Sequence, residues 1–304
     1  MMRDSTKVLM KKHGWRVDRA IHNYLYFAWY YPYVKTVSLA FKPLEYLTWL
    51  KPLKYAGNFI FSRYHSKVLS AGDTKKIFEL NENINIDGEE NKRVVPFKYA
   101  RKILFTDPEF IVVMDCPCKK ALGDKKEHIN SCLCVGSGTG KFWLDRCKKY
   151  NPRVVSQKEA LDLISSFRKK GYITQAFFKV ATGGSTGVIC NCHPDTCVSL
   201  RATALTKKID PKTYMTEVSG YSIKHDDKQC RRCGTCVQTC HFGAVNINGK
   251  GWTYDKDKCQ GCELCVENCP NGAIRLYADP EKSMPLDLDL IRERARKSAD
   301  ALRN

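Results

Sequence analysis

The residues of this sequence best suited to chemistry are its cysteines. The 304-residue chain contains 16 of them, and they occur in closely spaced C-x-C and C-x-x-C groups. Thiols grouped in this way bind metals in a reducing compartment, whereas disulfide frameworks are typical of exported proteins. The basic stretch from Met1 to Arg19 precedes an apolar run that Pro32 and Lys35 interrupt, so we expect no signal peptide. We therefore predict that the cysteines are metal ligands.

Eight of the cysteines form an internal repeat. Residues 230–245 read CRRCGTCVQTCHFGAV, and residues 259–274 read CQGCELCVENCPNGAI. Both copies follow the spacing C-x2-C-x2-C-x3-C. Three thiolates in a tight loop can bind three irons of one cubane, while the fourth starts a helical turn that points towards another cubane. Zinc sites would require neither the third cysteine nor the fourth at this spacing. The repeat therefore predicts two 4Fe–4S clusters.

Residues 230–274 resemble a bacterial-type dicluster ferredoxin domain. The crossed ligation of that family, carried over to this sequence, assigns four cysteines to each cluster. The ligands of the first cluster are then Cys230, Cys233, Cys236 and Cys269. The ligands of the second cluster are then Cys259, Cys262, Cys265 and Cys240. Crossed ligation brings the clusters close together, so the resemblance implies electron transfer between them.

One position departs from the family pattern. Proline usually follows the fourth cysteine of each copy, and Pro270 does so in the second, but His241 stands in the first. His241 could donate a hydrogen bond to a cluster sulfide and shift the reduction potential, or it could be a neutral replacement. We favour the neutral replacement.

A second group of cysteines precedes the repeat, in three short motifs. Three loops that each bring two or three thiols suggest one metal site assembled across a domain. We predict that its ligands come from Cys116, Cys118, Cys190, Cys192 and Cys197, with Cys132 in reserve. A third iron–sulfur cluster is the interpretation we favour; the alternatives are another metal such as zinc, or buried free thiols. Cys147 lies in a charged run and is expected near the surface.

The second group also resembles the cysteine-rich domains that are fused upstream of dicluster ferredoxins in anaerobic bacteria. Those domains are generally unassigned components of iron–sulfur oxidoreductases. The resemblance therefore implies an oxidoreductase setting without indicating a substrate. The glycine run at 135–141 lacks the first glycine and the final Ser or Thr of a P-loop, so no nucleotide site is predicted there.

Hydrophobic patterns predict the elements that present these cysteines. Residues 110–114 are apolar and β-branched, which predicts a buried strand ending just before Cys116. Residues 97–105 predict a short helix, and residues 172–180 a strand. Between them, Ser156 and Glu159 form a capping box that predicts the start of a helix.

We predict an α+β fold in four parts. Residues 1–70 form a basic, aromatic, helical segment for docking to a membrane or partner. Residues 71–221 form a Cys-rich α+β domain, and residues 222–278 a ferredoxin-like dicluster domain. Residues 279–304 form a closing helix.

The charge is concentrated at the N-terminus. The chain carries a net charge of +19, and residues 1–70 contribute 12 Lys or Arg against 3 Asp or Glu. Residues 222–278 contribute 8 against 6. Since four thiolates around an oxidised cubane leave a charge of about −2, two clusters would make that region slightly negative. The basic part of the protein is therefore not its redox domain.

The N-terminal segment combines this charge with 15 aromatic residues between Trp15 and Tyr64. Its longest stretch without charged residues, from Ala20 to Val34, is shorter than the ~20 residues that span a bilayer. Aromatic and cationic side chains together suit the headgroup layer of an anionic membrane. The alternatives are a partner interface, packing onto the middle domain, or nucleic-acid binding, which we do not expect.

Together, these features predict an iron–sulfur electron-transfer protein. It would relay low-potential electrons between a soluble donor and a membrane-associated or multi-subunit redox partner. An electron-carrier subunit of an oxidoreductase is expected rather than a stand-alone enzyme. We expect a cytoplasmic location, peripheral on the inner face of the membrane if residues 1–70 bind lipid. The alternative function is reduction of a small substrate at a third cluster in the middle domain.

Overall fold

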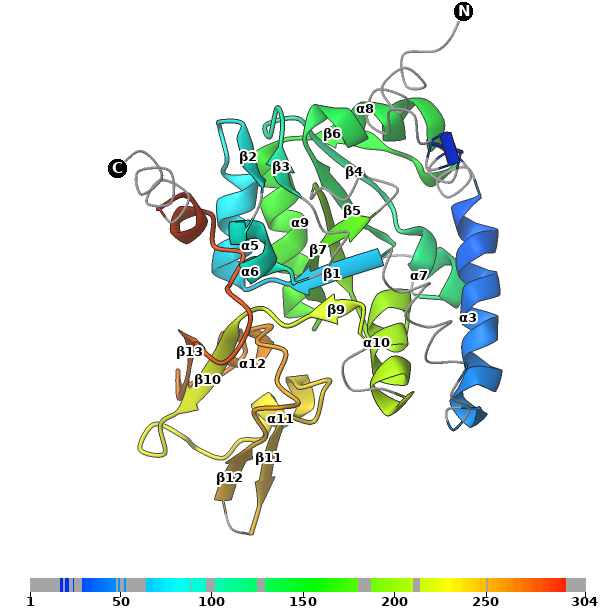
Figure 1. Ribbon diagram of the computed structural model, residues 1–304. Helices are drawn as coiled ribbons and strands as arrows, with labels where there is room; N and C mark the ends of the chain where they lie inside the picture. The colour runs from blue at the N-terminus through cyan, green and yellow to red at the C-terminus, as the bar shows by residue number, and fades with distance from the viewer. Residues whose placement is uncertain are drawn as a thin grey trace, which may run out of the picture.

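The computed structural model describes most of the chain from residue 64 onward, and a helix before it (Figure 1). The described residues are 17, 18, 20, 21, 24, 29–47, 49, 52, 64–87, 89–96, 102–124, 129–179, 187–209, 214–249 and 251–293. They form a larger sheet domain and a smaller domain beside it. None of the described helices has both the length and the hydropathy needed to span a bilayer.

A seven-stranded sheet forms the centre of the larger domain, in the order β6-β4-β5-β8-β7-β1-β9. Its strands are β1 (Tyr64–Val68), β4 (Ile111–Asp115), β5 (Asn130–Val135), β6 (Arg153–Val155), β7 (Ile173–Lys179), β8 (Val188–Cys192) and β9 (Thr216–Glu217). Neighbouring strands are antiparallel except β1 and β9. Because β1 lies between β7 and β9, residues 64–68 belong to this sheet and not to the N-terminal segment predicted to end at residue 70.

Side chains alternate between the two faces of the sheet, as expected for strands that are buried on both sides. In β4, Ile111 and Val113 face one core, whereas Val112 and Met114 face the other. The cysteines of β5 and β8 all face the core that contains Val112. The alternation therefore collects the strand cysteines on one face of the sheet, which we call the cysteine face.

Helices cover both faces (Figure 1). The face without cysteines carries α5 (Ala71–Phe78), α6 (Glu89–Val94), α9 (Gln157–Lys169) and the hairpin of β2 (Ile84–Asp87) and β3 (Lys102–Phe105). The cysteine face carries α3 (Tyr30–Tyr46), α7 (Pro117–Leu122), α8 (Ser137–Arg146), α10 (Val198–Ile209) and the 3-10 helix η2 (Lys148–Tyr150). The strand cysteines therefore lie between the sheet and a layer of helices packed on it.

Local sequence signals correctly predict strands β4 and β7 and helix α9. The Ser156 hydroxyl accepts a hydrogen bond from the N–H of Glu159 at 3.1 Å and so caps α9, as the capping box predicts. The helix predicted over 97–105 is wrong in its second half. That half forms β3, because its alternate side chains pack into the core beside β2. Residues 97–101 lie outside the described part of the chain.

The chain returns to the sheet domain after the smaller domain. Its returning segment is buried through three aliphatic side chains in the core without cysteines. These are Leu286, Leu288 and Ile291. The closing helix predicted for 279–304 is wrong in its first part, since residues 279–287 are not helical and the helix begins at residue 288. It is described to residue 293, and residues 294–304 lie outside the described part.

Helix α3 lies along the cysteine face beside α7 (Figure 1). It buries Tyr30, Val34 and Ser38, which are spaced about one helical turn apart. Leu39, on the opposite side, is exposed, and Tyr31 at the edge of the buried face is partly so. One side of the N-terminal segment therefore packs onto the middle domain, which is one of the alternatives considered above, and the other side remains open to a partner or membrane.

The smaller domain is built from the cysteine repeat. Its elements are β10 (Tyr221–His225), α11 (Thr235–Thr239), β11 (Val245–Asn248), β12 (Gly251–Tyr254), α12 (Leu264–Glu267) and β13 (Ile274–Ala278). Strand β10 pairs with β13, and β11 pairs with β12, both antiparallel. In Figure 1 helix α12 lies towards the sheet domain, while the β11–β12 hairpin points away from it.

Candidate metal centres

The two copies of the repeat fold into loops with the same backbone conformation. The residue two positions after the first cysteine is left-handed in both, with φ of 53° at Arg232 and 65° at Gly261. The next left-handed residue is Gly234 in the first copy and Glu263 in the second, with φ of 79° and 69°. We call these loops, with the short helices that follow, the first arm and the second arm. Their matching turns form a pseudo-symmetric pair of half-domains.

These turns point backbone N–H groups at the cysteine sulfurs. The N–H of Arg232 donates to Cys230 Sγ and that of Gly261 donates to Cys259 Sγ, both at 3.4 Å. The fourth cysteines follow the same rule: the N–H groups of Ala244 and Ala273 donate to Cys240 and Cys269 Sγ, both at 3.3 Å. N–H donors of this kind stabilise negative charge on thiolate sulfur and raise the potential of a bound cluster. Both arms therefore fit an iron–sulfur ligand loop.

The first predicted ligand set lines one small cavity. Its four members are Cys230, Cys233, Cys236 and Cys269. Cys269 belongs to the second arm, so the structure brings together the set that crossed ligation requires. His225 and Trp252, stacked with ring centroids 4.1 Å apart, also line the cavity.

The second predicted ligand set is more buried. Burial, together with the nearby Cys259 and Cys240 thiols, raises the pKa of the Cys262 thiol to about 12. Burial likewise raises the pKa of Cys265, with Cys240 again among its neighbours. Cys240 of the first arm therefore lies with the cysteines of the second. Since metal-free thiols with such pKa values stay protonated at neutral pH, cluster assembly must displace their protons.

The second arm is fastened to the sheet domain by hydrogen bonds. Arg168 of α9, only 4 % exposed, donates to the carbonyl oxygen of Cys262 at 2.7 Å and to both carboxylate oxygens of Glu267. The N–H of Ala71 donates to Glu263 Oε2 at 2.7 Å. Lys282 donates to the carbonyl oxygen of Cys259 at 3.0 Å.

The loop between Cys230 and Cys236 of the first arm is more exposed than its counterpart in the second arm. Arg231, Arg232 and Cys233 are all exposed, whereas Gln260 and Gly261 at the matching positions of the second arm are buried. The two candidate cluster sites therefore differ in access to solvent.

His241 of the first arm reaches the sheet domain. Its Nε2 lies 2.7 Å from the carbonyl oxygen of Gly171, and its ring packs edge-on against His193, with centroids 4.7 Å apart. Nothing in the local sequence pattern points to this contact, because His193 and His241 lie 48 positions apart.

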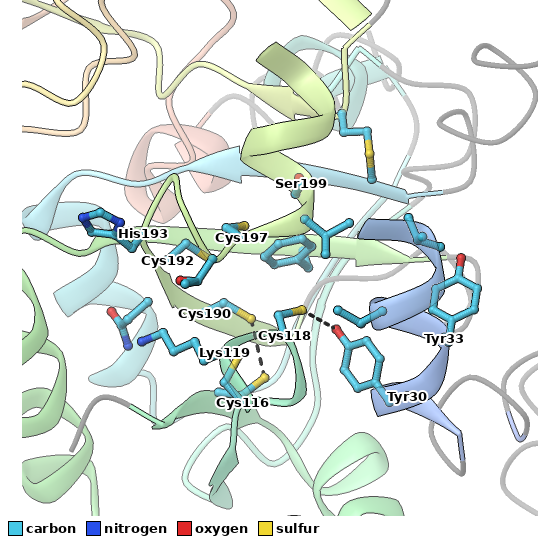
Figure 2. A pocket seen from close by; sticks show the side chains of 18 residues that line it. Tyr30, Tyr33, Cys116, Cys118, Lys119, Cys190, Cys192, His193, Cys197 and Ser199 are labelled. Atoms are coloured by element: carbon cyan, nitrogen blue, oxygen red, sulfur yellow. Dashed lines mark hydrogen bonds between the residues drawn. The ribbon is translucent and has the colours of Figure 1, made fainter. Parts of the chain in front are cut away.

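The cysteines of the second group surround one cavity on the cysteine face, which we call the six-cysteine cavity (Figure 2). It has a volume of about 80 Å³, and all six cysteines predicted for a third site line it. They are Cys116, Cys118, Cys132, Cys190, Cys192 and Cys197. Cys116 caps α7, and Cys197 directly precedes α10. Cys132 and Cys190 face each other across β5 and β8, with their sulfurs 3.5 Å apart.

Tyr30 and Lys119 also line the cavity, Gln175 contacts one of its cysteines, and none of the three was predicted from the sequence. Tyr30 of α3 closes it, with its hydroxyl 3.5 Å from Cys118 Sγ (Figure 2). Gln175 of β7 donates to Cys197 Sγ at 3.8 Å. Lys119, 1 % exposed, places its ammonium 3.8 Å from the ring centroid of Tyr172. Burial lowers the pKa of Lys119, while the nearby Cys116 thiol opposes that shift.

Two cysteines of the sheet domain lie outside the cavity. The prediction for Cys147 is wrong, since it is fully buried where α8 ends and packs in the core of the cysteine face. Burial raises the pKa of its thiol to about 12. Cys134 of β5 is also fully buried and donates to the carbonyl oxygen of Gly136 at 3.8 Å.

Some thiols of the six-cysteine cavity are in contact, since the sulfurs of Cys132 and Cys190 lie 3.5 Å apart. Within the described part of the chain, no three His, Cys, Asp or Glu side chains are grouped as the ligands of a single metal ion would be. This holds for the ferredoxin cysteines as well as for the six-cysteine cavity.

The comparison with known families agrees with this geometry. Residues 223–276 match the family model of the 4Fe-4S dicluster domain. Among curated proteins, none matches the chain. The chain therefore contains a ferredoxin-like dicluster segment that binds iron–sulfur clusters and gives the protein an electron-transfer role.

Proposed function

We propose that this chain relays low-potential electrons from a soluble donor to a membrane-associated or multi-subunit redox partner. Electrons enter at the first cluster and move to the second. The observation that carries this direction is the difference between the arms: Cys233 is exposed, whereas Gln260 and Gly261 of the second arm are buried. A donor can approach the first site closely, while the second is reached through protein.

The side chains and backbone set up this transfer. Each cluster, when bound, supplies a one-electron redox group. The N–H groups of Arg232 and Gly261 stabilise the extra negative charge of reduction at the two sites. Arg168 holds the second arm at a fixed distance from the sheet domain through Cys262 and Glu267. Because the second arm is held in a fixed position, its atoms move little when an electron is transferred, which keeps the reorganisation energy small.

The exposed arm favours an acidic donor. Arg231 and Arg232 lie beside the exposed Cys233. Cations around a docking site steer an acidic partner and raise the association rate, and this effect weakens as salt increases.

The test uses full-length protein purified without oxygen. A reduced acidic ferredoxin serves as the donor, and stopped-flow absorbance follows reduction of the chain. The double variant Arg231→Glu/Arg232→Glu should lower the second-order rate by about tenfold or more at low salt and abolish its salt dependence. Lys158→Glu, an exposed position on α9, makes the same type of charge change elsewhere and should leave the rate unchanged. Equal rates for all three proteins would reject the exposed arm as the docking site.

A second candidate function is reduction of a small substrate in the sheet domain. The observation that favours it is the cavity of about 80 Å³ among six thiols. The test adds small ligands such as cyanide to the reduced protein and records EPR spectra. A change confined to one set of signals would support a substrate site. Spectra unchanged by every ligand would reject the substrate site and favour a simple electron carrier.

We propose that the part of residues 1–70 before β1 is the surface that meets the acceptor or an anionic membrane. Exposed apolar side chains support this proposal: Trp29 lies in the turn before α3, Tyr31 in its first turn, and Leu39 on its outer side near Lys35. Removing residues 1–70 would also delete β1, so a substitution is the better test. The triple variant Trp29→Ser/Tyr31→Ser/Leu39→Ser should lose flotation with anionic liposomes, with Val154→Ser, an exposed position of β6, as control. Equal flotation of both variants would rule out membrane binding by this face.

A further inference from the structure

The six-cysteine cavity is a built site rather than a chance gathering of thiols. Its cysteines come from four separate segments: the start of α7, strand β5, strand β8 and the turn before α10. Cys118 is partly exposed, and the other five are between 2 and 8 % exposed. A site drawn from four segments has a fixed shape, because each segment is held by the sheet or by a helix packed on it.

Helix termini and a side-chain amide direct donors at two of these sulfurs. The N–H groups of Ser199 and Leu200, in the first turn of α10, point at the Cys197 thiol, and the amide of Gln175 donates to the same sulfur. The N–H of Lys119 plays this part at Cys116. These are the same backbone donors that the ferredoxin arms provide at Cys230 and Cys259. Donors of this kind favour sulfur that carries negative charge.

A buried cation balances that charge. Lys119 is 1 % exposed, its ammonium lies over two aromatic rings, and its charge interacts with Cys116, Cys190 and Cys192. Four thiolates around an oxidised cubane leave a net charge of about −2, which is costly to bury without a neighbouring cation. Asp124 also interacts with the Lys119 ammonium, so this cation is shared between a carboxylate and the cavity. The charges therefore favour an anionic group in the cavity.

The cavity is also connected to the dicluster domain. His193 directly follows the cavity residue Cys192, and His241 directly follows Cys240 of the predicted second cluster. The two imidazole rings are in edge contact at 4.7 Å between centroids. The contact therefore joins the neighbours of two candidate ligands, and Figure 2 shows His193 on the side of the cavity away from Tyr30.

We propose that the six-cysteine cavity holds a third iron–sulfur cluster and exchanges electrons with the dicluster domain across the contact of His193 with His241. The proposal rests on the relay function above and adds its internal destination. One electron leaves the dicluster domain, which is oxidised by one, and the third cluster is reduced by one. No covalent bond forms or breaks, and no proton need move.

Iron and acid-labile sulfide are counted on full-length protein purified without oxygen. The wild type should contain about twelve irons and twelve sulfides, four for each of three cubanes. The double variant Cys116→Ser/Cys197→Ser should fall to about eight of each, because the dicluster domain is untouched. Retention of eight irons also shows that this variant is folded.

Two other buried cysteines of the same domain serve as matched controls. Cys134→Ser and Cys147→Ser change fully buried thiols outside the cavity and should keep the wild-type iron content. About eight irons in the wild type, or one zinc ion that the cavity variant loses, would overturn the proposal while leaving the relay function intact. The variant Cys233→Ser distinguishes failure of the relay function from failure of the third-cluster proposal. If this variant loses no iron, the relay function is rejected, and the third-cluster proposal is not.

Electron transfer across the contact of His193 with His241 can be measured separately. In the wild type and in His241 variants with full iron content, an electron is injected by flash photolysis and its redistribution is followed by absorbance. His241→Ala should slow the redistribution several-fold, and His241→Phe, which restores a ring against His193, should recover much of it. Redistribution at the wild-type rate in His241→Ala would overturn the proposed route.

Discussion

The two arms of the dicluster domain follow one sequence pattern, yet one lies open to solvent and the other is packed against the sheet domain. Their loops share left-handed turns and N–H donors to sulfur. They differ in the residues between the cysteines, which are Arg231 and Arg232 in the first arm and Gln260 and Gly261 in the second. The cysteines therefore specify the cofactor, while the intervening residues specify what each cluster faces.

This difference implies a direction for electrons. A site with an exposed cysteine and two cations suits a transiently bound partner, whereas a buried site suits electron transfer within the molecule. Substitutions in the second arm should therefore lower the free energy of unfolding. Matched substitutions in the first arm should instead change the rate of association with the donor.

The largest effect is expected at Gly261, where the arms are matched residue by residue. Gly261 has a left-handed φ of 65°, and a Cβ there would meet the carbonyl oxygen of Tyr221 at 2.5 Å and also the Ser219 hydroxyl. Gly261→Ala should lower the free energy of unfolding by about 4 kcal/mol, from left-handed strain plus overpacking. At the matching position, Arg232→Gly should change it by less than about 1 kcal/mol. Urea unfolding of the loaded protein measures both, and equal losses would contradict the comparison.

Arg168 should show the next largest effect. Arg168→Ala leaves Glu267 and the carbonyl oxygen of Cys262 without their buried partner. Because the Glu267 side chain is 33 % exposed, water can replace part of the loss, and we expect about 3 kcal/mol of destabilisation. Arg231→Ala, the control in the open arm, should change stability by less than about 0.5 kcal/mol. A loss below 1 kcal/mol for Arg168→Ala would mean that the second arm is not fastened there.

The stability of the contact between the dicluster domain and the sheet domain should also depend on pH, through Asp73 of α5. Burial raises the pKa of Asp73 to about 6, and Tyr221 of the dicluster domain donates to its carboxylate at 3.1 Å. A raised carboxyl pKa means that its stabilising contribution is complete below pH 3.8 and is lost as pH rises through about 6.

Asp73→Asn keeps an acceptor for Tyr221 and avoids burying the charge. Its advantage over the wild type should grow between about pH 4 and 6, level off above that, and reach about 2 kcal/mol, somewhat less than the full shift implies. Thermal unfolding across this pH range measures it. A constant difference between the two proteins would show that Asp73 does not titrate on folding.

The smallest stability effect belongs to the open arm. The variant Arg231→Glu/Arg232→Glu should unfold within about 0.5 kcal/mol of the wild type, since neither side chain is buried. Its reaction with an acidic donor should nevertheless slow as described above. Reduction by dithionite, monitored by absorbance, should remain within about twofold, since a small reductant does not depend on the same docking surface. A large loss of stability would place these arginines in a packed contact.

The sequence was most informative where chemistry is set by short spacing. The loops around Cys230 and Cys259 could be predicted because their ligand geometry depends on a few consecutive residues. The gathering of Cys116, Cys190 and Cys197 was also predictable in part, since cysteines at strand ends on one face of a sheet come together.

What the sequence did not predict depends on contacts between distant segments. The insertion of β1 into the sheet, the closure of the cavity by Tyr30 and the contact of His193 with His241 have no local signal. Cys147 shows the same limit, because its charged neighbours suggested a surface position while the end of α8 turned its thiol inward. Local composition reports on solvation of a segment, but not on which side chain of that segment is buried.

The central claim is that the dicluster segment holds two neighbouring iron–sulfur clusters, and EPR of the fully reduced, anaerobically purified chain tests it most directly. We expect signals of reduced 4Fe–4S clusters broadened by magnetic interaction between two nearby spins. We also expect that Cys233→Ser removes this interaction while signals from the remaining iron persist. A colourless protein that carries zinc and gives no iron–sulfur signal on reduction would contradict the claim.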